Sequence, residues 1–150
     1  MADFIPIMGT YTYNLDGKNR IFIPAKHREA LGTNFVVFPN IKDSRSLMIS
    51  TVEYLDSVLK KIRENEDIPA EIRSGMISYL SGFGDTLTPD TQGRVVLSST
   101  LVSSAGLGGS TVIHGCHDHA EIWNASEFNA TTKEQADSYA DYFKKSNMVL

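Results

Sequence analysis

"LDGKNRIFIP", residues 15–24, decides the fold of this chain because the same pattern returns later in the sequence. The second stretch, "PDTQGRVVLS", occupies residues 89–98, 74 positions further along. Both stretches place an Asp four residues before an Arg, with turn-forming residues between them and an apolar run after them. This pattern is typical of a strand-turn-strand unit. Two explanations of the Asp and the Arg are open: an ion pair across a turn, or an Arg held in place to bind a phosphate or a base.

The offset of 74 residues persists beyond these two stretches. It pairs Gly32 with Gly106 and continues without a gap into the segments that follow. Few residues are identical, but the same kinds of element recur in one order, which indicates an internal duplication that has diverged. We therefore predict two repeats, residues 1–74 and 75–150, that form one compact unit.

Each repeat is predicted to contain strand, turn, strand, short helix, two strands and a long helix. In the first repeat, alternating tyrosine and threonine predict the first strand, and Pro24 suits the first turn of the short helix. Ser50 followed by Glu53 predicts a capping box for an amphipathic helix that ends near residue 63. Asn124 is the predicted cap of the equivalent helix, and Pro69 begins a further helix in between.

This order of elements predicts a mixed α+β fold. Neither repeat could bury its sheet alone. Pairing the repeats into one barrel-like or sandwich-like core would solve this and would create an internal pseudo-twofold axis. The two turns would then be symmetric partners.

The composition limits the classes of protein to which the chain can belong. The 150 residues carry 14 basic and 18 acidic side chains, a net charge of -4, so any DNA contact must depend on local clustering of charge. The sequence shows neither a signal peptide nor a run of about 18 apolar residues. The single cysteine, Cys116, cannot form an internal disulfide and suits a reducing compartment. We therefore expect a cytoplasmic protein.

Three stretches of the sequence resemble the MraZ family of bacterial regulators. They are "YNLDGKNRIFIPAKHREALG" from residue 13, "DTLTPDTQGRVVLSSTLVSSAGL" from residue 85, and "EIW" from residue 121. The resemblance covers roughly residues 8–143. It implies two tandem AbrB-like (SpoVT-AbrB, swapped-hairpin) halves that form one pseudo-twofold, double-ψ-type β-barrel with flanking helices.

The resemblance also implies a function. Members of this family bind double-stranded DNA sequence-specifically as ring-shaped homo-oligomers, at the promoter of the cluster of division and cell-wall genes and usually of their own operon. A nucleoid-associated protein with no enzyme activity and no cofactor is therefore expected. The residues agree, because the sequence has no nucleophile elbow, and "GLGG" at residues 106–109 lacks the Lys-Ser/Thr end of a phosphate loop.

An arginine in each turn is the central candidate for DNA contact. Its planar fork of donors suits a phosphate or the O6 and N7 atoms of guanine. Lys18 adds a positive charge to the first turn, where the second turn has the neutral Gln92. Basic residues on the short helix that follows the first turn could extend the same surface. The candidate DNA-binding residues are Lys18, Arg20, Lys26, Arg28, Gln92 and Arg94.

The acidic residues of the turns are predicted to brace them. Asp16 and Asp90 would repel phosphate, so we expect them to accept backbone N–H bonds and to orient the arginines. The family usually has Gly before the Arg; Gly93 retains it, and Asn19 can adopt the same left-handed conformation. The alternative is that each Asp and Arg only form a surface ion pair, which contributes little.

The two copies differ after the turn. The family usually has a proline and a further basic residue behind the second Arg, whereas this chain has Ser98 and Val102. We therefore expect the first turn to contribute more to DNA binding than the second. The net negative charge is answered by multiplicity, because a ring presents many turns and links modest contacts together.

A histidine-rich loop offers a different class of function. His114, Cys116, His117 and His119 are all possible ligands for zinc or another transition metal. One short loop seldom places four donors tetrahedrally, so a solvated loop is the favoured interpretation. A metal-binding or metal-sensing protein and a purely structural oligomer remain the alternatives to a DNA-binding regulator.

Overall fold

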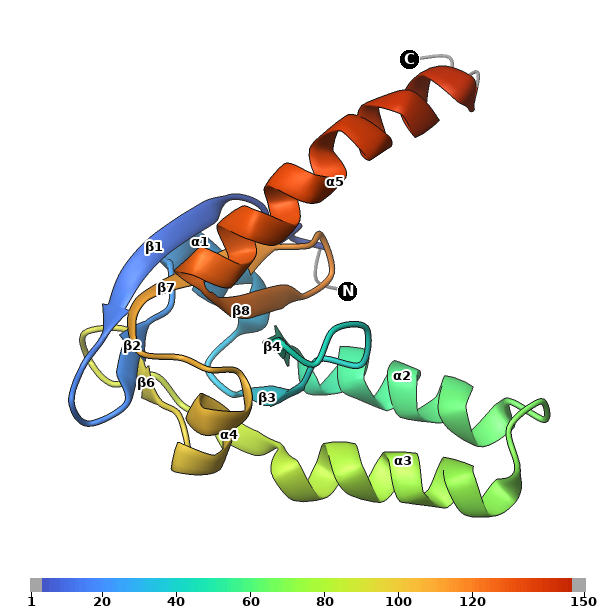
Figure 1. The fold of residues 1–150 in the computed structure, drawn as a ribbon. Coiled ribbons are helices and arrows are strands. Elements are labelled where there is room, and N and C mark those ends of the chain that lie inside the picture. Colours follow the sequence, from blue (N-terminus) through green and yellow to red (C-terminus); the bar gives the residue numbers. More distant parts are fainter. Residues whose placement is uncertain (1–3, 147–150) are drawn as a thin grey trace.

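The computed structural model of the chain describes residues 4–146 and confirms the mixed α+β class (Figure 1). In this part of the chain the strands are β1 (Thr10–Leu15), β2 (Arg20–Phe22), β3 (Phe35–Pro39), β4 (Ser46–Ser50), β5 (Asp85–Leu87), β6 (Arg94–Val96), β7 (Gly109–Gly115) and β8 (Ala120–Asn124). The helices are α1 (Ala25–Leu31), α2 (Val52–Glu64), α3 (Ala70–Phe83), α4 (Ser99–Ser104) and α5 (Ala125–Lys145). None of these helices is long and apolar enough to span a membrane.

The strands pair in a pseudosymmetric way. A six-stranded antiparallel sheet has the order β1-β7-β8-β4-β3-β5, and exchanging the two copies reproduces this order in reverse. At its centre, Leu47 pairs with Ile122 and Met48 with Glu121, an arrangement that the exchange leaves unchanged. The remaining two strands, β2 and β6, form a separate antiparallel ribbon centred on the pair Ile21 and Val95. Each strand pair at a centre therefore joins one copy to the other.

The gap-free offset of 74 residues is wrong inside β7. Ser50 of β4 pairs with Val36, whereas Asn124 of β8 pairs with Thr111, one residue further along than the offset requires. The loop at residues 116–119 is shorter than its counterpart at residues 40–45, and the hairpin absorbs the difference as a slipped register. The offset holds again in β8.

The predicted capping box of the first long helix is also wrong. Thr51, and not Ser50, caps α2, because its hydroxyl oxygen accepts a 3.1 Å bond from the amide of Tyr54. Ser50 still belongs to the β4 ladder and donates its hydroxyl to the carbonyl of Thr51. The cap of α5 is confirmed, since the side chain of Asn124 accepts bonds from the first amides of that helix.

Two apolar clusters hold the strands in place. The larger one lies between the ribbon and the sheet and includes Ile21 and Val95 from the ribbon and Val37 and Ile113 from the sheet. The smaller one lies under α2 and α3 and includes Phe38. Because neighbouring residues of a strand face opposite sides, β3 contributes Val37 to one cluster and Phe38 to the other.

This packing separates the molecule into distinct ends. The ribbon and its turns lie at one end, the hairpin of α2 and α3 extends from the other, and α5 packs its first turns on β7 and β8 before projecting away (Figure 1). The division into repeats 1–74 and 75–150 stays a prediction, and its boundary falls inside α3.

Candidate nucleic-acid interface

The first turn is closed by the carboxylate of Asp16. One of its oxygens accepts the amides of Lys18 and Arg20, both at 2.9 Å. The other accepts the Nε of Arg20 at 2.6 Å. Asn19 adopts the left-handed conformation, with φ 58°, and its amide donates to the carbonyl of Asp16. Every one of these contacts is local, which explains why the sequence pattern alone pointed to a turn.

The second turn repeats these contacts. Asp90 accepts the amides of Gln92 and Arg94 at 2.9 and 3.0 Å through one oxygen, and the Nε of Arg94 at 2.9 Å through the other. Gly93 occupies the left-handed position, with φ 85°. The two turns therefore share one backbone and one scheme of hydrogen bonds, although their intervening residues differ.

The two turns also hold each other. The amide of Ile23 donates a 3.0 Å bond to the carbonyl of Gly93. The equivalent amide of the second copy, Leu97, donates a 2.9 Å bond to the carbonyl of Asn19. Each strand therefore leaves its own turn and is tied to the turn of the other copy. Neither turn can move without disturbing its partner.

Both arginines lie on the outer face of the ribbon. Arg20 pairs across the ribbon with Val96, and Arg94 with Phe22, while Ile21 and its partner between them point into the core. Phe22 and Val96 are exposed, at 40% and 59%. The outer face therefore carries two arginines and two apolar side chains at alternating positions. Exposed apolar residues on a three-residue strand were the signal for Phe22 and Val96 that sequence reasoning missed.

The arginines are positioned by one nitrogen each. Within residues 4–146, only the Nε of Arg20 and the Nε of Arg94 make hydrogen bonds, so both pairs of outer Nη groups have no protein acceptor. The side chains are 32% and 23% exposed. Each guanidinium is thus fixed in orientation and still offers its outer donors to a ligand.

The carboxylates stay ionised over the whole neutral range. The backbone amide of Arg20, together with its side chain and the amide of Lys18, lowers the pKa of Asp16 to about 2. The amide of Arg94 and the other donors of the second turn lower the pKa of Asp90 in the same way. Each turn therefore contains a permanent ion pair.

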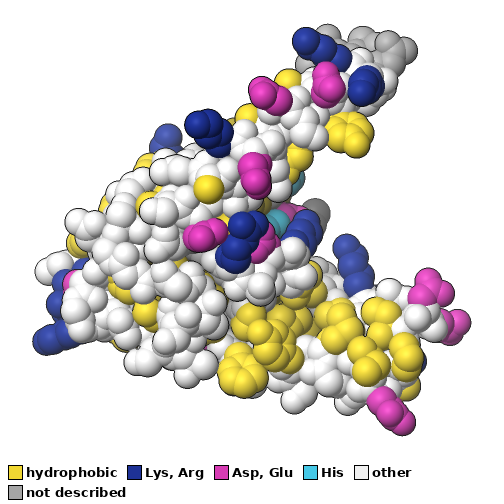
Figure 2. All heavy atoms as spheres, viewed as in Figure 1, with side chains coloured by type: hydrophobic (Ala, Val, Ile, Leu, Met, Phe, Trp, Pro, Cys, Tyr) yellow, Lys and Arg dark blue, Asp and Glu magenta, His cyan; other side chains and the backbone are white. Residues whose placement is uncertain are grey.

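The other candidate contacts occupy different surroundings. Lys18, Lys26 and Gln92 are exposed. Arg28 is half-buried, and its Nε donates a 3.0 Å bond to the carbonyl of Ile23. The roles of these side chains in DNA binding stay predictions. Figure 2 shows lysine and arginine side chains gathered at the end of the molecule where Figure 1 places the turns.

The candidate metal ligands do not form one group. The ring of His114 bonds the hydroxyl of Thr10, and the ring of His117 packs on Phe4 with centroids 5.0 Å apart. Cys116 and His119 instead come together with Glu121, which sequence reasoning missed. Glu121 lies two residues after His119 at the start of a strand, and that spacing was the available signal.

Comparison with known proteins agrees with this structure. A family model described as "MraZ protein, putative antitoxin-like" matches residues 7–49 and 84–147. A protein from Leuconostoc mesenteroides subsp. mesenteroides is 34% identical over 134 residues, 88% of this chain and 90% of the relative. One from Arthrobacter sp. is 31% identical over 89% of this chain and 92% of the relative. One from Limosilactobacillus reuteri is 31% identical over 95% and 98%, respectively. All three relatives are named "Transcriptional regulator MraZ".

The fold and the site define a class of protein: a duplicated α+β chain that displays two braced arginine turns on a ribbon shared by its halves. The matches extend over most of the sequence and include both turns. The chain belongs to the MraZ family of transcriptional regulators. The family is named for regulation and not for an enzymatic reaction.

Proposed function

We propose that this protein binds double-stranded DNA sequence-specifically through its two turns. It acts in the cytoplasm, in association with the nucleoid, on promoter repeats of the division and cell-wall gene cluster, including its own operon. The observation that carries this proposal is the pair of matching arginines, each held by its Nε while its outer donors face solvent. The names of the relatives support regulation of transcription.

The chemistry of the ribbon suits the major groove of DNA. A two-stranded ribbon fits within that groove, where arginine donors can reach the O6 and N7 atoms of guanine. Apolar side chains such as Phe22 and Val96 can contact the methyl group of thymine. Because Asp16 and Asp90 already orient the arginines, binding has less side-chain freedom to remove. The aspartates thus favour recognition without contacting the DNA.

A ring of subunits would supply the affinity that one protomer lacks. Two apolar surfaces support such assembly. The first, the α3 stripe, consists of Ile72, Met76, Tyr79 and Phe83. The second, the α5 stripe, consists of Tyr139, Tyr142 and Phe143. Figure 2 shows apolar side chains crowded over the hairpin of α2 and α3.

The two stripes differ from each other and lie on separate projecting elements (Figure 1). If the α3 stripe of one protomer contacts the α5 stripe of the next, the contact is head-to-tail, and such contacts close into rings when the rotation permits. We propose this arrangement for the oligomer. Each protomer would then add two turns to a common DNA-binding surface.

Gel-shift titration with DNA from upstream of the protein's own gene tests the DNA-binding proposal. Arg20→Ala is expected to weaken binding roughly 10- to 100-fold, and affinity should fall steeply with salt. Arg63→Ala is the matched control, because it removes an exposed arginine on α2 far from the ribbon. If the double variant Arg20→Ala/Arg94→Ala binds the operator as well as the unaltered protein, the proposed interface is wrong. A purely structural oligomer would retain no DNA in any variant.

A further inference from the structure

A second cluster of reactive side chains lies away from the ribbon, at the turn between β7 and β8. Cys116, His119 and Glu121 each present one possible metal-ligating atom, and these atoms lie within 4.8 Å of one another. We propose that these three residues bind a single transition-metal ion of the zinc class, with a fourth coordination position open to water. This site is independent of DNA binding, so its test does not depend on the proposed function.

The turn itself brings the three side chains together. The amide of Cys116 donates a 2.8 Å bond to the carbonyl of His119, which closes the turn. His117, between them, adopts a positive φ of 77°, a conformation that L-residues seldom take. Glu121 follows His119 by two residues, so both side chains leave the same side of the extended chain.

His119 is oriented as metal-binding histidines usually are. Its Nδ1 lies 2.8 Å from a carboxylate oxygen of Asp118, which leaves Nε2 as the nitrogen for a metal. A carboxylate behind a ligating histidine fixes the ring and raises its basicity. The ring is also buried and stacks on Tyr54 of α2, with centroids 5.2 Å apart. The imidazole is thus held from two sides.

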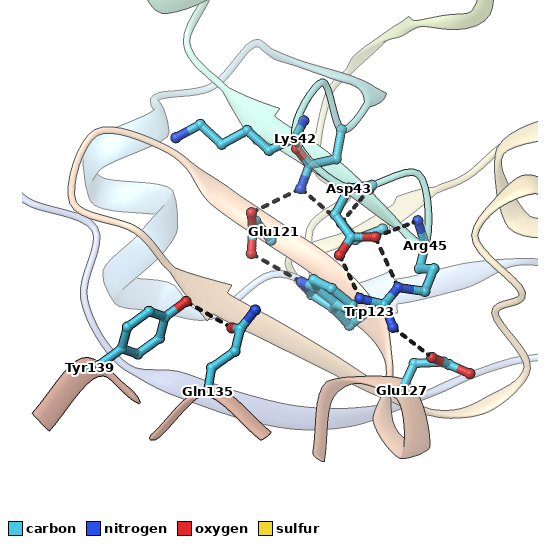
Figure 3. Close-up of polar contacts among 10 residues, drawn as sticks. Lys42, Asp43, Arg45, Glu121, Trp123, Glu127, Gln135 and Tyr139 are labelled. Atoms are coloured by element: carbon cyan, nitrogen blue, oxygen red, sulfur yellow. Dashed lines mark hydrogen bonds and ion pairs between the residues drawn. The ribbon is translucent and has the colours of Figure 1, made fainter. Parts of the chain in front are cut away.

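Glu121 is held in place by neutral donors. The side-chain amide of Asn40 donates to one carboxylate oxygen at 2.8 Å, and the indole of Trp123 donates to the other at 3.0 Å (Figure 3). Each oxygen keeps a further lone pair for a cation. Within residues 4–146, Glu121 takes part in no ion pair, so its charge is not balanced by a bonded partner.

The ligand set selects the kind of metal. One sulfur, one imidazole nitrogen and one carboxylate oxygen suit zinc and its neighbours, whereas magnesium and calcium prefer oxygen alone. A thiolate and a carboxylate would balance the charge of a divalent ion. Tetrahedral bonds of about 2.0–2.3 Å place neighbouring ligand atoms about 3.6 Å apart, so the present spacing requires only a small closure of the side chains.

The competing explanation is a metal-free contact in which the thiol of Cys116 donates a hydrogen bond to Glu121. Burial, followed by the nearby carboxylate of Glu121, raises the pKa of this thiol to about 12. Such a thiol would stay protonated without a metal. The two explanations differ in a property that can be measured directly, which is whether the sulfur binds a metal ion.

Cobalt(II) is the probe that distinguishes them. The full-length protein, reduced, stripped of metal with a chelator and kept anaerobic, is titrated with Co²⁺. We expect one equivalent to bind with the sulfur-to-cobalt absorption of a thiolate ligand and the intense visible bands of tetrahedral cobalt, and Zn²⁺ should displace it. Zn²⁺ should also raise the Tm of the protein, because it binds the folded state.

Variants assign the ligands. Cys116→Ser should abolish the sulfur-to-cobalt absorption, and Glu121→Gln should weaken Zn²⁺ binding at least about 10-fold. Asp118→Asn, which alters a positioning residue, should weaken it by about 10- to 100-fold while the sulfur-to-cobalt absorption remains at saturation. His114→Ala and His117→Ala are the matched controls and should bind normally.

Three results would overturn the proposal. They are the absence of saturable cobalt or zinc binding to the unaltered protein, thiolate absorption that persists in Cys116→Ser, and loss of binding in His117→Ala with Glu121→Gln unaffected. Circular dichroism of each metal-free variant checks folding. If Cys116→Ser does not fold, Glu121→Gln together with the absorption of the unaltered protein decides the question.

Discussion

The guanidinium group of Arg28 lies against Gly93. A Cβ atom at Gly93 would come within 2.7 Å of the central carbon of that guanidinium. Arg28 belongs to the first repeat and Gly93 to the turn of the second, so this contact crosses the pseudo-twofold axis. At the offset of 74 residues, the counterparts of these two residues are Val102 and Asn19, which cannot reproduce it. The two turns share a backbone but not their neighbours.

Gly93→Ala is therefore expected to destabilise the protein. The positive φ at this position would cost a residue with a Cβ roughly 1–2 kcal/mol, and the new methyl group would displace Arg28. Gly17→Ala, in the other turn, is the control, because its Cβ would meet nothing within 4 Å. Urea unfolding at a fixed protein concentration measures both. Equal stability of the two variants would contradict the strain that we infer at Gly93.

The turns are expected to differ in their electrostatic contribution to DNA binding. Lys18 carries a charge in the first turn, and Gln92 occupies the equivalent position in the second. If Lys18 contacts a phosphate, Lys18→Ala should reduce the slope of log affinity against log salt by about 1 per operator contact, whereas Gln92→Ala should leave the slope unchanged. Gel shifts at several salt concentrations measure the slope. A smaller slope for Gln92→Ala would reverse the assignment.

Local features of the fold could be predicted from the sequence, and non-local ones could not. The turn at Asp16 depends on donors within four residues, so the pattern of side chains contains all the information. The register of β7 depends on the length of a hairpin loop that differs between the repeats, and sliding the sequence on itself cannot detect such a slip. The cap of α2 was misplaced by one residue because Ser50 was needed in a strand pair.

The candidate site shows the same division. Arg20 and Arg94 were identified because the duplication marks them. The contact of Arg28 with Gly93 was not, since it joins segments far apart in the sequence. The grouping of Cys116, His119 and Glu121 likewise follows from the conformation of one turn, whereas the histidine-rich sequence suggested a broader and partly different set.

Asp16 is expected to titrate far below an ordinary aspartate. Because the donors of the turn lower its pKa to about 2, the turn should keep its hydrogen bonds throughout the mildly acidic range. The stability that Asp16 contributes is present above its ordinary pKa of 3.8 and is lost as the pH falls through about 2. The NMR resonance of the Arg20 Nε–H group should shift with the same midpoint. A midpoint near pH 4, or an unchanged titration in Asp16→Asn, would contradict the bracing contact.

His27 is expected to make the fold sensitive to mild acid. Its ring is fully buried; Nε2 donates to the carbonyl of Met8, and Nδ1 has no hydrogen-bond partner within residues 4–146. Burial lowers the pKa of His27 below its ordinary value of 6.5, because a charged ring would lack solvent. The unfolded chain therefore binds this proton first, and the free energy of unfolding should decrease as the pH falls below about 6.5.

Unfolding of His27→Gln tests this dependence. The side-chain amide can still donate to the carbonyl of Met8 but does not titrate. Between about pH 7.5 and pH 5.5 the variant should lose less stability than the unaltered protein. Some dependence should remain, since burial also lowers the pKa of His114. An identical loss in both proteins would show that His27 does not cause the sensitivity.

The oligomer should dissociate when either apolar stripe receives a charge. Tyr79→Glu alters the α3 stripe and Tyr142→Glu the α5 stripe, and both side chains are more than half exposed. Each variant alone should have a smaller mass by light scattering, because a head-to-tail contact needs both surfaces. Ser74→Glu is the control, since it adds the same charge to an exposed position on another face of α3.

Mixing the two variants distinguishes a head-to-tail contact from a symmetric one. A Tyr79→Glu protomer keeps its α5 stripe and a Tyr142→Glu protomer keeps its α3 stripe, so the mixture can form one good contact and then no more. A head-to-tail ring therefore predicts dimers in the mixture and monomers in each variant alone. If the α3 stripes instead paired with each other, Tyr142→Glu would assemble normally and mixing would add nothing. Either result would also decide whether neighbouring ribbons face the DNA in one direction, as promoter repeats arranged in tandem require.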